Sequence, residues 1–317
     1  MARILVTGAA GFIGSRLTEL LSARGDSVVA VDCFLPDLYS AEMKKTRFEQ
    51  LRGLPNVTLH ELDLRHDDLS VMGHIDVVIN EAAMAGLTKS WDNLALYIDN
   101  NVMALDRVLQ FARSVNVSKF IQISTSSVYG RIAEGAEDGP TEPFSPYGVS
   151  KLAAEKLGLA YFTNFDFPFT ALRYFSVYGP GHRPDMAYHR FLVAARDGQP
   201  ITVYGDGEQR RTNTYVDDCV EGTIATIDKA KPGEVYNISG TESYSINEAL
   251  DIIREITGVD LDVRYEAPRA GDQKETRGVI DKAVSELGYH PTWTLRDGLT
   301  QEWEWIKTLP ADYSIRP

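Results

Sequence analysis

Short apolar runs alternate with amphipathic stretches through the first half of the chain. Runs with the length and composition of buried strands are predicted at residues 3–7, 27–32, 57–62, 77–80, 119–124 and 170–174. Apolar residues at helical spacing predict helices at 12–24, 94–115 and 146–164, the first of which ends at Gly25. Strands rich in valine and isoleucine that alternate with helices indicate an α/β fold, in which a parallel sheet is covered on both faces.

The pattern becomes more polar after about residue 175. Turn signals stand at 178–181 and 205–207, one more strand is predicted at 235–239, and helices are predicted at 246–257 and 297–307. We therefore predict a sheet domain at 1–174 and a smaller α/β cap domain at 175–317. The cap is expected to be interwoven with a return to the sheet around 214–240.

Composition narrows the class of protein. The chain has 317 residues, is 44% hydrophobic and carries a net charge of −13, so it can bury a sizeable core but is unsuited to nucleic acid or anionic membranes. Cys33 and Cys219 lie far apart with no metal-binding spacing, which fits a reducing cytoplasm and no metal site. No apolar stretch reaches the roughly 18 residues that a membrane span needs.

A glycine run joins the first predicted strand to the first helix. Gly8 permits a tight turn, Gly11 lets the backbone approach a pyrophosphate, and Gly14 permits close helix packing. The helix N-terminus, with Phe12 and Ile13 in its first turn, then faces the phosphates. This context predicts a Rossmann-type doubly wound sheet with a dinucleotide site. The alternative is a glycine-rich turn in an ordinary α/β protein.

Asp32 ends the second predicted strand. A carboxylate there accepts hydrogen bonds from both ribose hydroxyls and repels a 2′-phosphate. Because the next residues, Cys33 and Phe34, supply no positive charge, we predict NAD rather than NADP as the cofactor.

Residues after the third and fourth strands also face this site. Asp63 and Leu64 are placed to contact the adenine, although a solvated strand end is an equally good interpretation. Ala82 and Ala83 let the backbone lie against the cofactor, and simple helix propensity is the alternative.

Tyr147 and Lys151 stand four residues apart on a predicted helix, so their side chains share one face. An ammonium beside a phenol stabilises the phenolate and lowers its pKa from about 10. Tyr147 is therefore a candidate general base for an alcohol. Without the glycine run, the pair is equally well explained as an accident of helix spacing.

Together these residues resemble a known family. Gly8-x-x-Gly11-x-x-Gly14, Asp32, Ser124-Thr125-x-x-Val128-Tyr129-Gly130 and Tyr147-x-x-x-Lys151 resemble the extended short-chain dehydrogenase/reductase superfamily. Tyr97-x-x-x-Asn101-Val102, the segment 173–180 and Gly205-Asp206-Gly207 are similar to its nucleotide-sugar branch. The resemblance implies NAD, a nucleotide diphosphate sugar and a catalytic triad of Thr125, Tyr147 and Lys151. It also places Asn101, Tyr147 and Lys151 at the cofactor.

Two segments are similar to UDP-glucuronate 4-epimerases: 181–187 and Thr125-Ser126-Ser127. Sugar 4,6-dehydratases of this fold carry Asp and Glu where Ser126 and Ser127 stand, and hydroxyls cannot do that acid–base work. Neutral hydroxyls can instead hold a sugar carboxylate, with Arg183 as a bidentate partner and Ser176 in reach. The alternatives are that the serines cap the next segment and that Arg183 is a surface residue.

By the same resemblance, Arg211 and Arg269 hold the substrate diphosphate and Asp272 contacts the uridine ribose. Solvated surface arginines are the alternative. Several residues depart from the family pattern, among them Glu81, Met84 and Thr88 near the sugar pocket.

The resemblance therefore predicts NAD-dependent C4 epimerisation of a UDP-sugar, with UDP-glucuronate favoured over UDP-glucose or UDP-N-acetylglucosamine. A UDP-glucuronate decarboxylase and a catalytically silent NAD-binding sensor or scaffold remain as alternatives. A homodimer formed through the helices at 94–115 and 146–164 is also expected.

Overall fold

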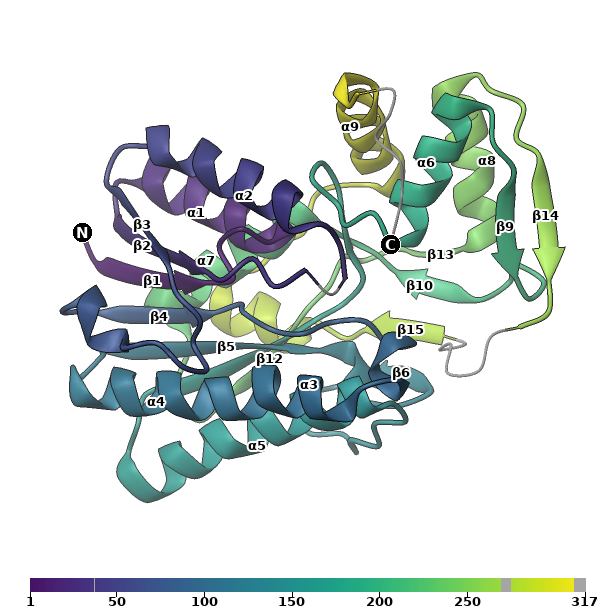
Figure 1. The fold of residues 1–317 in the computed structure, drawn as a ribbon. Helices are drawn as coiled ribbons and strands as arrows, with labels where there is room; N and C mark the ends of the chain where they lie inside the picture. The colour runs from purple at the N-terminus through teal and green to yellow at the C-terminus, as the bar shows by residue number, and fades with distance from the viewer. Residues whose placement is uncertain (37, 269–274, 311–317) are drawn as a thin grey trace.

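The computed structural model describes residues 1–36, 38–268 and 275–310. Its centre is a seven-stranded sheet in the order β12-β7-β5-β4-β1-β2-β3, and every pairing in it is parallel (Figure 1). The strands are β1 (Arg3–Thr7), β2 (Ser27–Asp32), β3 (Val57–Glu61), β4 (Val77–Asn80), β5 (Lys119–Thr125), β7 (Phe169–Tyr174) and β12 (Val235–Ile238). The direction of winding reverses between β1 and β4, and ligands bind at the carboxyl ends of strands at such a point.

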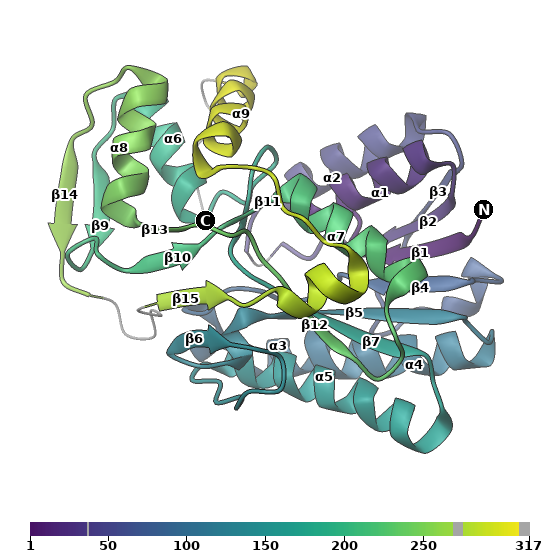
Figure 2. The same cartoon turned by 180° about the vertical axis from the view of Figure 1, so that it is seen from behind.

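Helices cover both faces of this sheet (Figures 1 and 2). One face carries α1 (Phe12–Arg24), α2 (Ala41–Gln50) and α7 (Val216–Lys229), and the other carries α3 (Leu94–Ile98), α4 (Ala104–Ser114) and α5 (Pro146–Phe165). Successive strand residues point to opposite faces, so Val6 and Ile79 join one buried cluster while Leu5 and Val78 join the other. The predicted Rossmann-type doubly wound sheet is confirmed.

A smaller group of elements stands beyond the carboxyl ends of the strands. Its helices are α6 (Ala187–Asp197), α8 (Ile246–Thr257) and α9 (Leu295–Thr308). Its strands are β9 (Ile201–Tyr204) paired with β14 (Val263–Glu266), β8 (Val177–Tyr178) paired with β11 (Thr214–Tyr215), and a mixed sheet of β13 (Ser243–Ser245), β10 (Arg210–Thr212), β15 (Glu275–Gly278) and β6 (Ile132–Gly135). The chain returns to the large sheet through α7 and β12. The exact division at 174/175 stays a prediction.

Short helical turns complete the path of the chain. The 3-10 turns are Leu51–Gly53, Leu69–Met72, Lys89–Trp91 and Ser126–Val128, and the π-helical segments are Asp99–Met103 and Ala283–Leu287. The single helix predicted at 94–115 is therefore wrong in detail, because the π-helical segment at Asp99–Met103 separates α3 from α4. The sequence also failed to indicate α2, α6 and α7.

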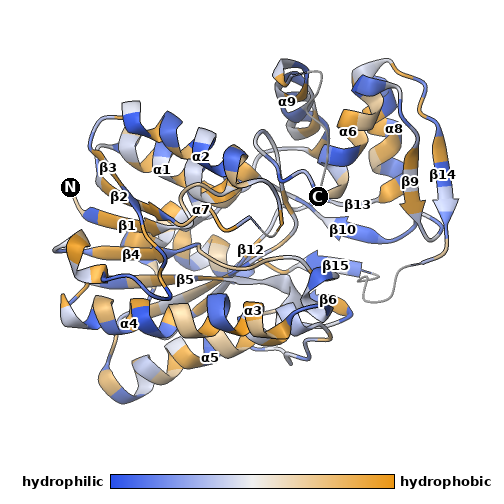
Figure 3. Cartoon of the chain, in the orientation of Figure 1, coloured by the Kyte–Doolittle hydropathy of each residue, from blue (hydrophilic) through white to orange (hydrophobic). Residues whose placement is uncertain are grey.

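Apolar residues gather on the strands of the large sheet, whereas β10 and β15 of the smaller group are largely polar (Figure 3). Within the described ranges, none of the helices has the length and apolar character needed to cross a membrane.

Candidate active site

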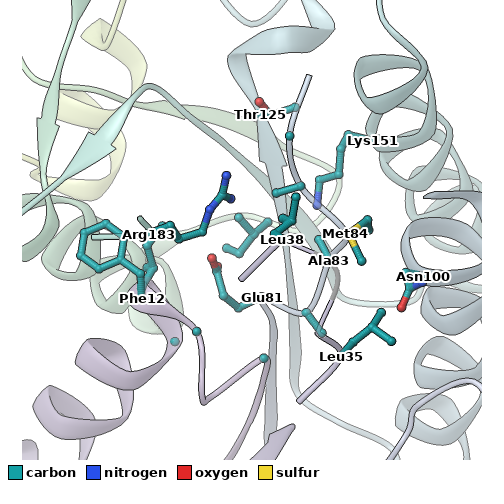
Figure 4. Close-up of a pocket in the computed structure, with 18 of the residues that line it drawn as sticks. Phe12, Leu35, Leu38, Glu81, Ala83, Met84, Asn100, Thr125, Lys151 and Arg183 are labelled. Atoms are coloured by element: carbon teal, nitrogen blue, oxygen red, sulfur yellow. The ribbon is translucent and has the colours of Figure 1, made fainter. Parts of the chain in front are cut away.

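The carboxyl ends of the parallel strands open into a cavity of about 440 Å³ (Figure 4). Its walls include most of the residues that the sequence assigned to a cofactor or substrate: Gly8, Gly11, Phe12, Ile13, Gly14, Asp32, Asp63, Leu64, Ala82, Ala83, Thr125, Ser126, Ser127, Tyr147, Lys151, Ser176, Arg183 and Arg211. Arg269 and Asp272 lie outside the described residues. Asn101 is described but is not part of the wall.

The glycine turn between β1 and α1 is too tight for side chains. Gly8 has φ +68°, and a Cβ there would lie 2.8 Å from the nitrogen of Ala82. A Cβ on Gly14 would lie 2.3 Å from the oxygen of Gly8. Bare backbone at the start of a helix fits a dinucleotide pyrophosphate, so these residues are suited to hold NAD.

Asp32 lies at the end of β2 with its carboxylate fixed by the backbone. One oxygen accepts from Phe34 N at 2.8 Å and the other from Ala10 N at 3.0 Å. Burial raises the pKa of Asp32, while these amides and the charge of Lys44 oppose that rise. The carboxylate is thus directed at the cavity in a position suited to the ribose hydroxyls.

Asp63 lies at the same edge, where it forms a two-pronged ion pair with Arg65, with Oδ2 2.7 Å from Nη2. The hydrogen bond from Arg65 lowers the pKa of Asp63. This pairing occupies much of the carboxylate that we expected at the adenine.

Asn101 lies behind the cavity wall, in the π-helical segment. Its Oδ1 accepts from Met84 N at 2.7 Å, and its Nδ2 donates to Met84 O at 3.0 Å and to Ser150 Oγ at 2.9 Å. The side chain therefore fixes the loop after β4 against α5. In this structure Asn101 positions the wall rather than facing the cavity.

Tyr147 and Lys151 are brought together at the start of α5. Ser145 caps the helix by accepting from Gly148 N at 3.1 Å, so both side chains lie on its first turns. Lys151 is 3% exposed, and burial lowers its pKa to about 8, although Glu81 and Glu155 act in the opposite direction.

The expected fall in the pKa of Tyr147 is not seen in the protein alone. Burial raises this pKa, while a hydrogen bond with Thr125 and the charge of Arg183 oppose the rise. The sequence indicated the neighbouring ammonium but not the cost of burying a phenolate. A cationic nicotinamide in the cavity would supply further positive charge.

A buried ion pair fixes α5 to the sheet. Arg173 on β7 and Glu155 on α5 are 2% and 0% exposed, and Arg173 Nη2 lies 2.6 Å from Glu155 Oε1. Ser124 also donates to Glu155, at 3.1 Å. Sequence reasoning missed this pair, which determines where the helix places Tyr147 and Lys151.

The three hydroxyls that follow β5 are all buried in the cavity wall. Thr125 Oγ1 accepts from Ser127 N at 3.2 Å, so Thr125 caps the 3-10 turn in addition to its contact with Tyr147. Thr125 also donates to Ser127 Oγ at 3.3 Å. Thr125 and Ser127 are therefore linked to each other, and all three hydroxyls are neutral.

Arg183 comes from the loop before α6, and its guanidinium reaches into the cavity (Figure 4). It forms a bidentate pair with Asp185, at 3.0 Å from Nε and 2.8 Å from Nη2. The loop is held in turn by Glu302 of α9, which lies 3.0 Å from His182 Nδ1 and accepts from Gly179 N at 3.2 Å. Sequence reasoning did not find Asp185 or Glu302.

Ser176 and Arg211 extend the wall towards a second cavity of about 280 Å³, which both residues also line. Ser176 has φ +30°, a strained conformation for a residue with a side chain, and such strain is most often found at functional sites. The two adjoining cavities provide room for a ligand longer than the dinucleotide end alone.

Within the described ranges, no cluster of three or more His, Cys, Asp or Glu residues is arranged to hold a metal ion. The fold and the site together define an enzyme with a Rossmann dinucleotide site and a tyrosine–lysine pair in the wall of its cavity.

Comparison with known proteins agrees with that class. The model of the NAD dependent epimerase/dehydratase family matches residues 4–239, and the chain belongs to this family. NAD is its cofactor, and the protein is an enzyme of the epimerase class.

Three relatives match over nearly their whole length. The crystal structure of the UDP-glucuronic acid 4-epimerase from Bacillus cereus, in complex with UDP-glucuronic acid and NAD, has a TM-score of 0.92 and 40% identity, covering 96% of this chain and 99% of that one. The UDP-glucuronate 4-epimerase of Thermodesulfobacterium geofontis is 34% identical, covering 97% of each. The uncharacterized UDP-glucose epimerase YtcB of Bacillus subtilis is 39% identical, covering 97% of this chain and 98% of the relative.

Proposed function

We propose that the protein catalyses NAD-dependent epimerisation at C4 of a UDP-sugar, and that its substrate is UDP-glucuronate, which it converts reversibly to UDP-galacturonate. The observation that carries this proposal is the convergence of Tyr147, the hydroxyls at 125–127 and Arg183 on one cavity. The similarity to two UDP-glucuronate 4-epimerases supports it.

Tyr147 acts as the base in this proposal. Its phenolate, which the Thr125 hydroxyl and the Lys151 ammonium stabilise, takes the proton of the C4 hydroxyl and becomes a phenol. Bound NAD supplies the chemistry of taking the C4 hydride and returning it. The 4-keto sugar turns about its diphosphate between these two events, and Tyr147 then returns the proton to the new C4 hydroxyl.

Arg211 is the described cation proposed for the diphosphate, since it lines both cavities. Arg269 and Asp272, which lie outside the described residues, remain proposed contacts to the diphosphate and the uridine ribose.

The hydroxyls and Arg183 protect a reactive intermediate. Oxidation of glucuronate at C4 gives a β-keto acid, which loses carbon dioxide when its carboxylate bond aligns with the carbonyl π system. Ser126, Ser127 and Ser176 offer neutral donors that hold the carboxylate away from that alignment, and Arg183 offers a charged one. Since Ser126 and Ser127 are not acids, a 4,6-elimination is disfavoured.

A neutral UDP-hexose is the second candidate substrate. It is favoured by the pairing of Arg183 with Asp185, which already satisfies the guanidinium, and by the similarity to YtcB. The experiment is to follow the anomeric proton by NMR with UDP-glucuronate and with UDP-glucose, using wild type and Arg183→Ala.

We expect faster turnover of UDP-glucuronate, reduced about 30-fold by Arg183→Ala because a charged hydrogen bond is lost. The rate with UDP-glucose should change much less. Preference for UDP-glucose would contradict the proposed substrate, and a pentose product with carbon dioxide would reveal a decarboxylase.

We further propose a cytoplasmic homodimer that pairs through α3–α5. Exposed apolar side chains on these elements support the dimer: Leu94 is 51%, Met103 55%, Val149 48% and Phe165 52% exposed. The free thiols of Cys33 and Cys219 suit the cytoplasm. Light scattering of wild type and Val149→Glu tests this, with a dimer expected only for the wild type and a monomeric wild type contradicting it.

A further inference from the structure

Glu81 is an acidic side chain in the catalytic cavity that the proposed base chemistry does not use. It directly follows β4, and both of its neighbours are fixed. The Asn80 amide donates to Gln122 and accepts from Thr7, and the nitrogen of Ala82 donates to Thr7 Oγ1 at 3.1 Å. The side chain is therefore held in the cavity that also contains Lys151 and Arg183 (Figure 4).

The surroundings of Glu81 are poor in donors. Glu81 is partly exposed to the cavity, but its Oε2 is buried and has no hydrogen-bond partner among the described residues. The titratable groups that act on it are Lys151 and Tyr147 of α5, Tyr174 of β7 and Cys219 of α7. Of these four groups, Lys151 alone can bring a positive charge.

Arg183 is a second cation beside Glu81 among the residues labelled in Figure 4. Its charge lowers the pKa of Tyr147, but its guanidinium is already paired with Asp185. Its charge is therefore largely neutralised, and it adds little to the stabilisation of an ionised Glu81.

A carboxylate without donors is costly to ionise. Burial raises the pKa of Glu81 to about 8, and the charge of Lys151 opposes this rise. The carboxyl group therefore keeps its proton near neutral pH until another positive charge enters the cavity. Oxidised nicotinamide carries such a charge and reduced nicotinamide does not.

The position of Glu81 connects it to that end of the cofactor. The glycine turn and Asp32 are suited to the pyrophosphate and the ribose, whereas hydride transfer needs the nicotinamide beside Tyr147 and Lys151. Glu81 shares this part of the cavity wall with Lys151 and Arg183 (Figure 4), so it lies at the nicotinamide end of the cavity.

We propose that Glu81 discriminates between the oxidised and the reduced cofactor, its carboxylate stabilising the cationic NAD⁺ against neutral NADH. An epimerase returns each hydride, so it starts every cycle from NAD⁺, and a bias towards NAD⁺ favours the active state. Binding of NAD⁺ releases the Glu81 proton to solvent, whereas binding of NADH leaves it in place. This inference rests on the NAD dependence of the family and not on the identity of the sugar.

The test is a binding competition that needs no turnover. The protein is equilibrated with mixtures of NAD⁺ and NADH between about pH 6 and 9, and bound NADH is measured by its fluorescence. For wild type, we expect the preference for NAD⁺ to grow about tenfold as pH rises and the carboxylate forms. For Glu81→Gln the preference should be about tenfold weaker at the upper pH, and the pH dependence that remains belongs to Lys151, whose pKa is about 8. Glu81→Asp, which keeps the charge, should keep the pH dependence.

Glu134→Gln is the matched control, because Glu134 is an exposed carboxylate on β6. It should behave as wild type. A wild-type preference that does not change with pH would overturn the inference, as would an unchanged preference in Glu81→Gln. If Glu81→Gln does not fold, Glu81→Leu takes its place in the same competition, since it also removes the carboxylate and leaves Lys151 as the group that titrates. If the protein does not turn over UDP-glucuronate but the competition gives the expected result, the proposed substrate is rejected. The inference about Glu81 then still holds.

Discussion

The two sides of the catalytic cavity are built by different means. On the side of the large sheet, residues stand at strand ends and the main chain fixes them, as the close approach of Gly8, Gly14 and Ala82 shows. On the cap side, Arg183 stands on a loop where it pairs with Asp185, and hydrogen bonds of Glu302 with His182 and with the nitrogen of Gly179 hold that loop. Main-chain contacts therefore shape the side that is suited to NAD, whereas side-chain contacts hold the loop whose Arg183 we propose to select the sugar.

The largest expected effect is at Tyr147, where the two sides meet. Tyr147→Phe removes the proposed base and should lower kcat about 10³-fold. The affinity for NAD should stay unchanged, because the main-chain cradle is intact. Quenched activity assays measure kcat, and cofactor fluorescence measures the affinity for NAD. Tyr161→Phe, on the same helix but bonded to Asp106, should keep near wild-type activity, and an active Tyr147→Phe protein would remove the base from the mechanism.

The next effect tests the backbone side. Gly14→Ala places a Cβ 2.3 Å from the oxygen of Gly8. It should lower the free energy of unfolding by about 2 kcal/mol and weaken NAD binding, because backbone atoms must move. Thermal unfolding and cofactor titration measure both. Gly53→Ala is the control, since no heavy atom lies within 4 Å of its Cβ, and equal losses in the two variants would show that close packing at Gly14 is unimportant.

On the cap side we expect a smaller effect, which falls on binding of the sugar and not on binding of NAD. Glu302→Gln weakens the contacts with His182 and Gly179, and the loop that carries Arg183 is held less firmly. KM for the UDP-sugar should rise about tenfold while NAD affinity is unchanged. Glu304→Gln, which changes an exposed carboxylate of α9, is the control. A loss of NAD affinity in Glu302→Gln would mean that the two sides are not separate.

The smallest expected effect concerns Asp185. Asp185→Asn removes a negative charge beside Arg183, so the substrate carboxylate no longer competes with it. Affinity for UDP-glucuronate should rise about threefold, with that for UDP-glucose unchanged. Calorimetric titration of both ligands measures this. Weaker binding of UDP-glucuronate would show that Asp185 serves to orient Arg183.

The sequence predicted the elements of the large sheet better than those that carry polar residues at buried positions. The strands at 3–7, 27–32 and 77–80 and the helix at 12–24 have the predicted bounds, because buried parallel strands are continuous apolar runs and Gly25 ends the helix with φ 92°. The sequence did not indicate α7, in which polar Asp218, Thr223 and Thr226 stand among the buried positions.

In the candidate site, the sequence likewise indicated some residues and not the contacts that others make. Residues at strand ends were found because the edge of a parallel sheet brings them together. The contacts of Asn101 depend on a π-helical segment that no apolar pattern indicates. Glu81 was visible as a departure from the family pattern, but its relation to Lys151 depends on strand and helix meeting across the cavity.

The central claim is that the hydride removed from C4 is held by the enzyme and returned to the same carbon. Epimerisation of UDP-glucuronate in D₂O tests it most directly, with the product examined by proton NMR. We predict UDP-galacturonate that retains its proton at C4 and at C5. Deuterium at either carbon, or no UDP-galacturonate from a folded protein with bound NAD, would contradict the account.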